Sequence, residues 1–113
     1  MMEKGYQLTF FTRQDCTFGN QPLGQWLLEL ARELGLKGAT VSGGLEGVGH
    51  DGRVHMVNLY DLSEQPLKIV MVVSEVDYRR LLQRLEQEPV SIFCTAAEVE
   101  FGMAGGGNPT PAP

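Results

Sequence analysis

The residues best able to do chemistry gather in a glycine-rich stretch, residues 38–52, where six of the fifteen positions are glycine. Glycine allows positive-φ turns and a close approach of the main chain, so successive N–H groups can form a nest for an anion. Gly47 and Gly49 are candidate ligands of this kind. The alternative is a bulged or twisted strand end at a contact between copies, because the spacing differs from the Gly-x-Gly-x-x-Gly of dinucleotide folds.

Positive side chains lie on either side of this stretch. Lys68 interrupts the otherwise apolar segment 67–73, and burying an unpaired ammonium group is costly. Lys68 therefore either reaches solvent along its aliphatic stem or neutralises a bound anion. Arg13 and Arg53 flank the first strand and the glycine-rich stretch. They can add charge to a cleft, or they are ordinary surface arginines.

Two histidines and a carboxylate offer a different chemistry. His50, Asp51 and His55 lie close together in the sequence, and imidazole with carboxylate suits zinc or copper, although histidines in a polar loop are more often solvated. No catalytic residue is predicted, because no acid and base recur together at a helical or strand spacing. Cys94 lies in an alternating segment and is expected to be a small core residue.

Strands and helices must position these groups. Strand-like or extended patterns cover residues 6–12, 39–45, 54–62, 67–73 and 91–101. The segment 67–73 is apolar at every position but one, which is typical of a strand covered on both faces.

Two apolar stripes predict helices. The first has Pro22 in its first turn, with Asn20 or Gln21 as its cap, and ends at Gly35 in a left-handed turn. The second begins at Ser74, whose spacing to Asp77 resembles a capping box.

The order of elements is strand, helix, strand with a glycine-rich arm, strand, helix, strand. It predicts an α+β, ferredoxin-like βαββαβ sandwich over residues 1–101, with two helices on one face of an antiparallel sheet. Residues 102–113 carry no charge and are expected to form a disordered Gly/Pro-rich tail. Because no helix is left for the second face of the sheet, we expect the chain to associate with copies of itself.

Length and charge exclude other classes of protein. The 113 residues are enough for one domain. A formal net charge of -5 and a pI of about 4.9 argue against nucleic-acid binding. No apolar run approaches the roughly 20 residues that cross a bilayer, and the first residues lack a secretory pattern. We expect a cytoplasmic protein.

Three short motifs resemble the PII signalling proteins and their PII-like relatives, a family grouped as a domain of unknown function. They are Gly38-x-Thr40-Val41, Gly47-Val48-Gly49 and Leu67-Lys68-Ile69. The resemblance implies a homotrimer whose clefts between subunits bind a nucleotide or another small anion. It also implies that the glycine-rich arm, the T-loop of that family, changes conformation and contacts a transporter, an enzyme or a regulator.

Mapped onto this sequence, the resemblance and the residue chemistry give Thr40, Gly47, Gly49, Arg53 and Lys68 as ligand-binding residues. The ligand itself and any cofactor are not identified by the sequence. No metal site is assigned.

One segment departs from the nucleotide-binding members of the family. Residues 86–91 read Glu-Gln-Glu-Pro-Val-Ser, where those members hold phosphates with glycine and basic residues. Two carboxylates and a proline, which has no N–H to donate, would repel a polyphosphate. Two alternatives follow: a metal-responsive trimer similar to the divalent-cation tolerance proteins, using His50 and His55, and a small dimeric α+β-barrel enzyme with one of these histidines as general base.

Overall fold

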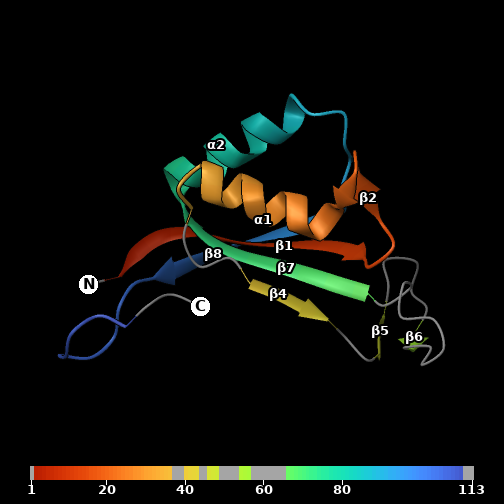
Figure 1. The fold of residues 1–113 in the computed structure, drawn as a ribbon. Coiled ribbons are helices and arrows are strands. Elements are labelled where there is room, and N and C mark those ends of the chain that lie inside the picture. The colour runs from red at the N-terminus through yellow and green to blue at the C-terminus, as the bar shows by residue number, and fades with distance from the viewer. Residues whose placement is uncertain (1, 37–39, 44–45, 49–53, 57–65, 111–113) are drawn as a thin grey trace.

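The computed structural model of the protein describes residues 2–36, 40–43, 46–48, 54–56 and 66–110, with the main chain alone between residues 40 and 56. Figure 1 shows two helices lying over one sheet. In chain order the elements are β1 (Glu3–Arg13), β2 (Thr17–Phe18), β3 (Gln21–Pro22), α1 (Leu23–Glu33), β4 (Thr40–Gly43), β5 (Glu46–Val48), β6 (Val54–Met56), β7 (Pro66–Ser74), α2 (Glu75–Glu86) and β8 (Cys94–Phe101).

The main sheet has four strands in the order β4-β7-β1-β8, and every neighbouring pair is antiparallel. Both helices lie on the same face of this sheet (Figure 1). This arrangement confirms the predicted α+β, ferredoxin-like sandwich. The short strands β5 and β6 pair with each other in a separate hairpin within the arm that joins β4 to β7.

The core lies between the helices and the two central strands. Leu8 is paired with Met71 and Phe10 with Ile69 across β1 and β7, and all four side chains are at most 1% exposed. Because side chains alternate along a strand, these residues share the face that the helices cover. Leu27 of α1 and Leu81 of α2 are fully buried against them.

Helix α1 begins differently from the prediction. Its N-cap is Pro22, and no side chain caps the helix, so the assignment of Asn20 or Gln21 is wrong. Residues 17–22 instead form the small β2–β3 hairpin, whose last residue, Pro22, directly precedes the first turn of α1. At the other end Gly35 has a φ of 74°, and the Leu36 N–H donates to the Ala31 carbonyl at 2.8 Å, as the left-handed end requires.

Helix α2 begins at its predicted cap. The Asp77 N–H donates to the Ser74 hydroxyl oxygen at 3.1 Å, and Ser74 is in an extended conformation. Glu75 and Asp77 place negative charge in the first turn, where the helix dipole favours it.

Strand β8 corrects one prediction. Cys94 is exposed rather than part of the core. The alternation that predicted burial is real, since Cys94 is paired with the buried Phe10, but β8 is an edge strand that the helices leave open. Residues 102–110 follow β8 as an exposed segment, and its disorder remains a prediction. No helix in the described part of the chain is long and apolar enough to cross a membrane.

Candidate functional site

The candidate ligand-binding site lies on the face of the sheet opposite the helices. By the register of the strands, this face carries the odd-numbered residues of β1 and β8 and the even-numbered residues of β7. Away from the strand ends, this set includes Gln7, Thr9, Phe11, Lys68, Val70, Val72, Thr95, Ala97 and Val99. Val70, Val72 and Val99 remain half-buried, and no described helix covers them. We refer to these nine residues as the open face.

Lys68 lies on the open face between two strands. It is paired with Phe11 of β1 and with Ser42 of β4, and its side chain is exposed. Among the described residues, no carboxylate lies within ion-pair distance of its ammonium group. The lysine is thus available to an anion at the point where β4 leads into the arm.

An aromatic pair beside Lys68 was missed by the sequence reasoning. The rings of Phe11 and Phe93 lie 5.6 Å apart at 55°, and the Phe11 N–H donates to the Phe93 carbonyl at 2.9 Å. The two side chains are 37% and 51% exposed. The alternation of β1 could have placed Phe11 on this face, and the alternation of the predicted strand at residues 91–101 could have placed Phe93 on the face opposite Cys94.

The structure brings Thr40 near Lys68 in register. Thr40 is paired with Val70, and Ser42 is paired with Lys68, so Thr40 and Lys68 are two steps apart on adjacent strands. Gly47 lies in β5, opposite His55 of β6. Gly49, Arg53, His50 and Asp51 lie outside the described residues, so their roles as ligands remain predictions.

Arg13 has local partners at the same end of the sheet. Its Nε and Nη2 atoms lie 3.1 Å from the two carboxylate oxygens of Asp15. A guanidinium group held in this forked arrangement has part of its charge neutralised. Lys68 is therefore the better candidate for an anion ligand.

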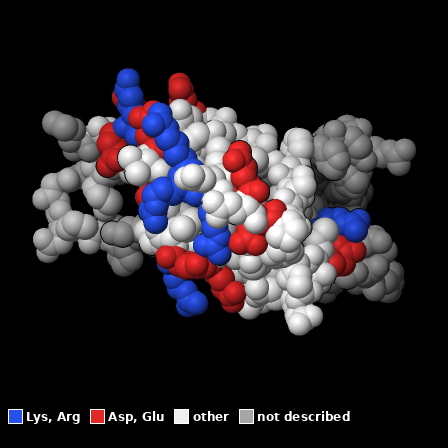
Figure 2. All heavy atoms as spheres, turned by 90° about the horizontal axis from the view of Figure 1, so that it is seen from above, with Lys and Arg blue, Asp and Glu red and all other residues white. Residues whose placement is uncertain are grey.

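The helix layer carries mixed charge. Figure 2 shows blue and red side chains interleaved over this face. Arg79, Arg80 and Arg84 of α2 each have a carboxylate within 4 Å: Glu75 at 3.5 Å, Asp77 at 2.8 Å and Glu33 at 3.0 Å, respectively. These arginines are paired with carboxylates on an exposed helix face and do not form a bare basic patch.

Arg84 also reduces the negative charge of the turn at residues 86–91. Its Nε donates to a carboxylate oxygen of Glu88 at 3.1 Å. Hydrogen bonds to Glu33 and Glu88 raise the pKa of the Arg84 guanidinium. One of the two carboxylates in this turn is therefore neutralised within the chain, which weakens the repulsion of phosphates that the sequence alone predicts.

Two hollows lie near β8. One, of about 250 Å³, is mainly apolar and lies between α2 and β8 beside Cys94, with Phe10, Leu82, Leu85 and Ile92 among its lining residues. The other, of about 290 Å³, lies at the N-terminal end of α2. Lys68 lines neither hollow. These two cavities of the single chain are therefore not the predicted anion site. No three metal-binding side chains come together in the described ranges.

Comparisons with solved structures place the fold among PII-like proteins. Over 91% of this chain and 92% of the other, the structure matches CPII, a nitrogen regulatory PII-like protein from Thiomonas intermedia K12, bound to ADP, AMP and bicarbonate, with a TM-score of 0.63 and 19% identity. A putative PII-like signalling protein from Thermus thermophilus matches over 88% and 91% of the two chains, with a TM-score of 0.63 and 22% identity.

Sequence comparison gives the family. A UPF0166 protein from Aquifex aeolicus is 32% identical over 80 residues, which is 70% of this chain and 76% of that relative. The profile of DUF190, described as "Uncharacterized ACR", matches residues 5–101, which span both helices and all of the four-stranded sheet except the first two residues of β1. The chain belongs to the DUF190 family, whose fold is that of the PII-like proteins.

Proposed function

We propose that the protein is a PII-like regulator that binds a small anion, an adenine nucleotide or bicarbonate, in clefts between the subunits of a homotrimer. The observation that carries the proposal is Lys68: an exposed lysine on the open face, with no carboxylate partner among the described residues, next to the root of the arm. The ligands bound to CPII, which are ADP, AMP and bicarbonate, support this chemistry.

The open face supports the assembly. Val70, Val72 and Val99 are half-buried apolar side chains on a sheet face without a helix. Covering such a face removes apolar surface from water at about 25 cal/mol per Å². A second and a third copy would cover it, and the crevices between them would border Lys68, Thr40 and the arm.

The conformation of the arm would depend on whether the ligand is bound. It runs from β4 to β7, the two strands that carry Thr40 and Lys68. An anion held by Lys68, Arg53 and the N–H groups of Gly47 and Gly49 would favour one arm conformation over others. A transporter or an enzyme that recognises that conformation would then respond to ligand concentration. No chemical step on the ligand is part of the proposal.

Isothermal titration tests the ligand site. ADP and bicarbonate are titrated into the wild-type chain, into Lys68→Ala, and into Lys4→Ala, which removes the same charge at the other end of β1. A hydrogen bond to a charged group contributes about 1.5–3 kcal/mol, so Lys68→Ala should weaken binding about tenfold or more. Equal affinities in the two variants, or no heat with either ligand, would contradict the proposal.

A further inference from the structure

We propose that the outer edge of β8 binds an extended, arginine-containing segment of a partner protein by adding it as a fifth strand. β8 is the last strand of the sheet order β4-β7-β1-β8, and among the described strands it pairs with β1 alone. Its eight residues include no proline or lysine, and its only charged residues are Glu98 and Glu100, which would repel an acidic strand and attract a basic one. All of them except Val99 and Phe101 are exposed.

The register shows which main-chain groups are free. The Phe11 N–H donates to the Phe93 carbonyl, and hydrogen-bonded pairs recur at every second position of an antiparallel ladder. The odd-numbered residues of β8 therefore direct their N–H and C=O groups toward β1. Cys94, Ala96, Glu98 and Glu100 direct theirs outward, where the described part of the chain provides no neighbouring strand.

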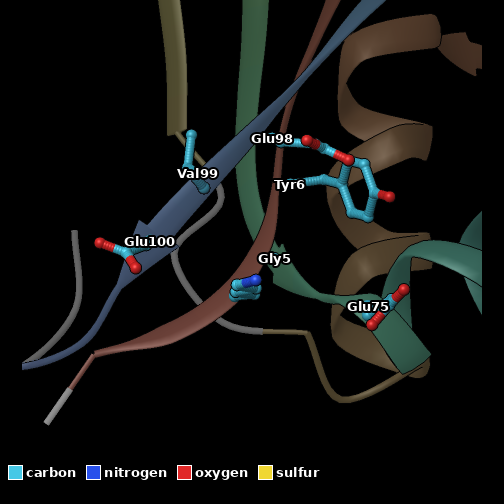
Figure 3. Close-up of a pocket in the computed structure, with 7 residues that line it drawn as sticks. Gly5, Tyr6, Glu75, Glu98, Val99 and Glu100 are labelled. Atoms are coloured by element: carbon cyan, nitrogen blue, oxygen red, sulfur yellow. The ribbon is translucent and has the colours of Figure 1, made fainter.

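A hollow of about 290 Å³ lies beside this edge (Figure 3). It is lined by Lys4, Gly5, Tyr6, Glu75, Glu98, Val99 and Glu100. In Figure 3 the Glu98 carboxylate lies next to the Tyr6 ring on the helix side of β8, and Glu75 stands at the start of α2. Glu98 and Glu100 form no ion pair among the described residues. Lys4, which is paired with Glu100 in register, adds one positive charge, so the three carboxylates leave the lining net negative.

Arginine fits this hollow better than other side chains. On an added strand, a residue opposite Glu98 would direct its side chain to the same face as Glu98, toward the hollow. A guanidinium group can bind a carboxylate with two parallel hydrogen bonds and can also lie against an aromatic ring. The Tyr6 ring is held in place by stacking on Tyr78, with ring centroids 4.0 Å apart, so an arginine would meet a fixed aromatic ring.

The same charges disfavour pairing of this edge with the β8 edge of a second copy. Pairing two β8 strands would bring the Glu98 and Glu100 carboxylates of both copies together, and like charges on paired strands are destabilising. The edge also differs from the arm, which leaves the sheet at the opposite edge strand, β4. A partner at β8 and an anion at Lys68 would therefore occupy separate sites.

The test uses the full-length chain and a fluorescein-labelled ten-residue peptide in which arginine alternates with threonine and valine. Fluorescence anisotropy should show binding that weakens with added salt. A peptide with glutamate in place of arginine should not bind. Ala96→Pro, which removes one outward N–H and leaves the ladder to β1 intact, should weaken binding at least tenfold. Ala96→Thr, which keeps the N–H, is its matched control.

Glu98→Gln provides a second, conservative variant and should weaken arginine-peptide binding about three- to tenfold, whereas Glu29→Gln on the exposed side of α1 should not. Unchanged affinity in both Ala96→Pro and Glu98→Gln would overturn the proposal. So would a fall in the mass of the protein in Ala96→Pro, because the edge would then belong to the contact between copies. Nucleotide titration of Glu98→Gln should match the wild type, so the two proposals can fail separately.

Discussion

The two faces of the central sheet are built from the same strands but differ in what lies over them. On the helix side, Ile69, Met71 and Val73 of β7 are at most 3% exposed. On the open face, the alternating Val70 and Val72 are only half-buried and Lys68 is exposed. The difference teaches that the helix side holds the buried core of the single chain, whereas the open face keeps surface that the proposed association and ligand binding would use.

The largest effect is expected for a truncation on the helix side. Met71 is fully buried, so Met71→Ala should lower the free energy of unfolding by about 2–5 kcal/mol. Urea denaturation followed by circular dichroism measures this change. A loss below about 1 kcal/mol would mean that the helix side is not the main source of stability.

A matched pair of neighbouring valines sharpens the comparison. Val73→Ala, on the helix side, should lower the free energy of unfolding by about 2 kcal/mol at any protein concentration. Val72→Ala, on the open face, should act through association, so its cost should shrink as the protein is diluted. Denaturation curves at several protein concentrations separate the two cases. A concentration-independent cost for both would show that the open face is not covered by other copies.

The smallest effect is expected at the junction between the two regions. Ser74 ends β7 and caps α2 through the Asp77 N–H, so Ser74→Ala should lower the free energy of unfolding by about 1 kcal/mol. Ser74→Asp, which keeps a capping oxygen, should restore most of it. Anion affinity at Lys68, which lies six residues away along β7, should stay unchanged in both variants.

Much of the fold could be predicted because each long element has a clear period. The alternation of β1, the apolar run of β7 and the stripes of α1 and α2 were enough to predict the ferredoxin-like βαββαβ sandwich. The N-cap of α1 was wrong because the β2–β3 hairpin competes with a capping loop at residues 17–22. Cys94 was wrong because alternation gives the face of a strand and does not tell whether a helix reaches far enough to cover an edge.

The site was predictable in part. Lys68 was found because a charge within an apolar strand has few stable solutions, and the structure places it on the open face. Phe93 was missed although it lies in the predicted strand at residues 91–101, because alternation alone does not give the register that places it against Phe11. The partnership between Arg84 and Glu88 joins residues four apart, yet its third member, Glu33, comes from α1 and depends on how the helices pack. Sequence spacing alone does not contain that information.

The association of three chains through the open face is the central claim, and the mass in solution tests it most directly. Multi-angle light scattering on the full-length chain at micromolar concentration should give three times the 12.4 kDa chain mass. Val72→Asp, which places a charge on the open face, should reduce it to one chain. A wild-type mass of a single chain at every concentration would contradict the account, because no cleft between subunits would then exist beside Lys68.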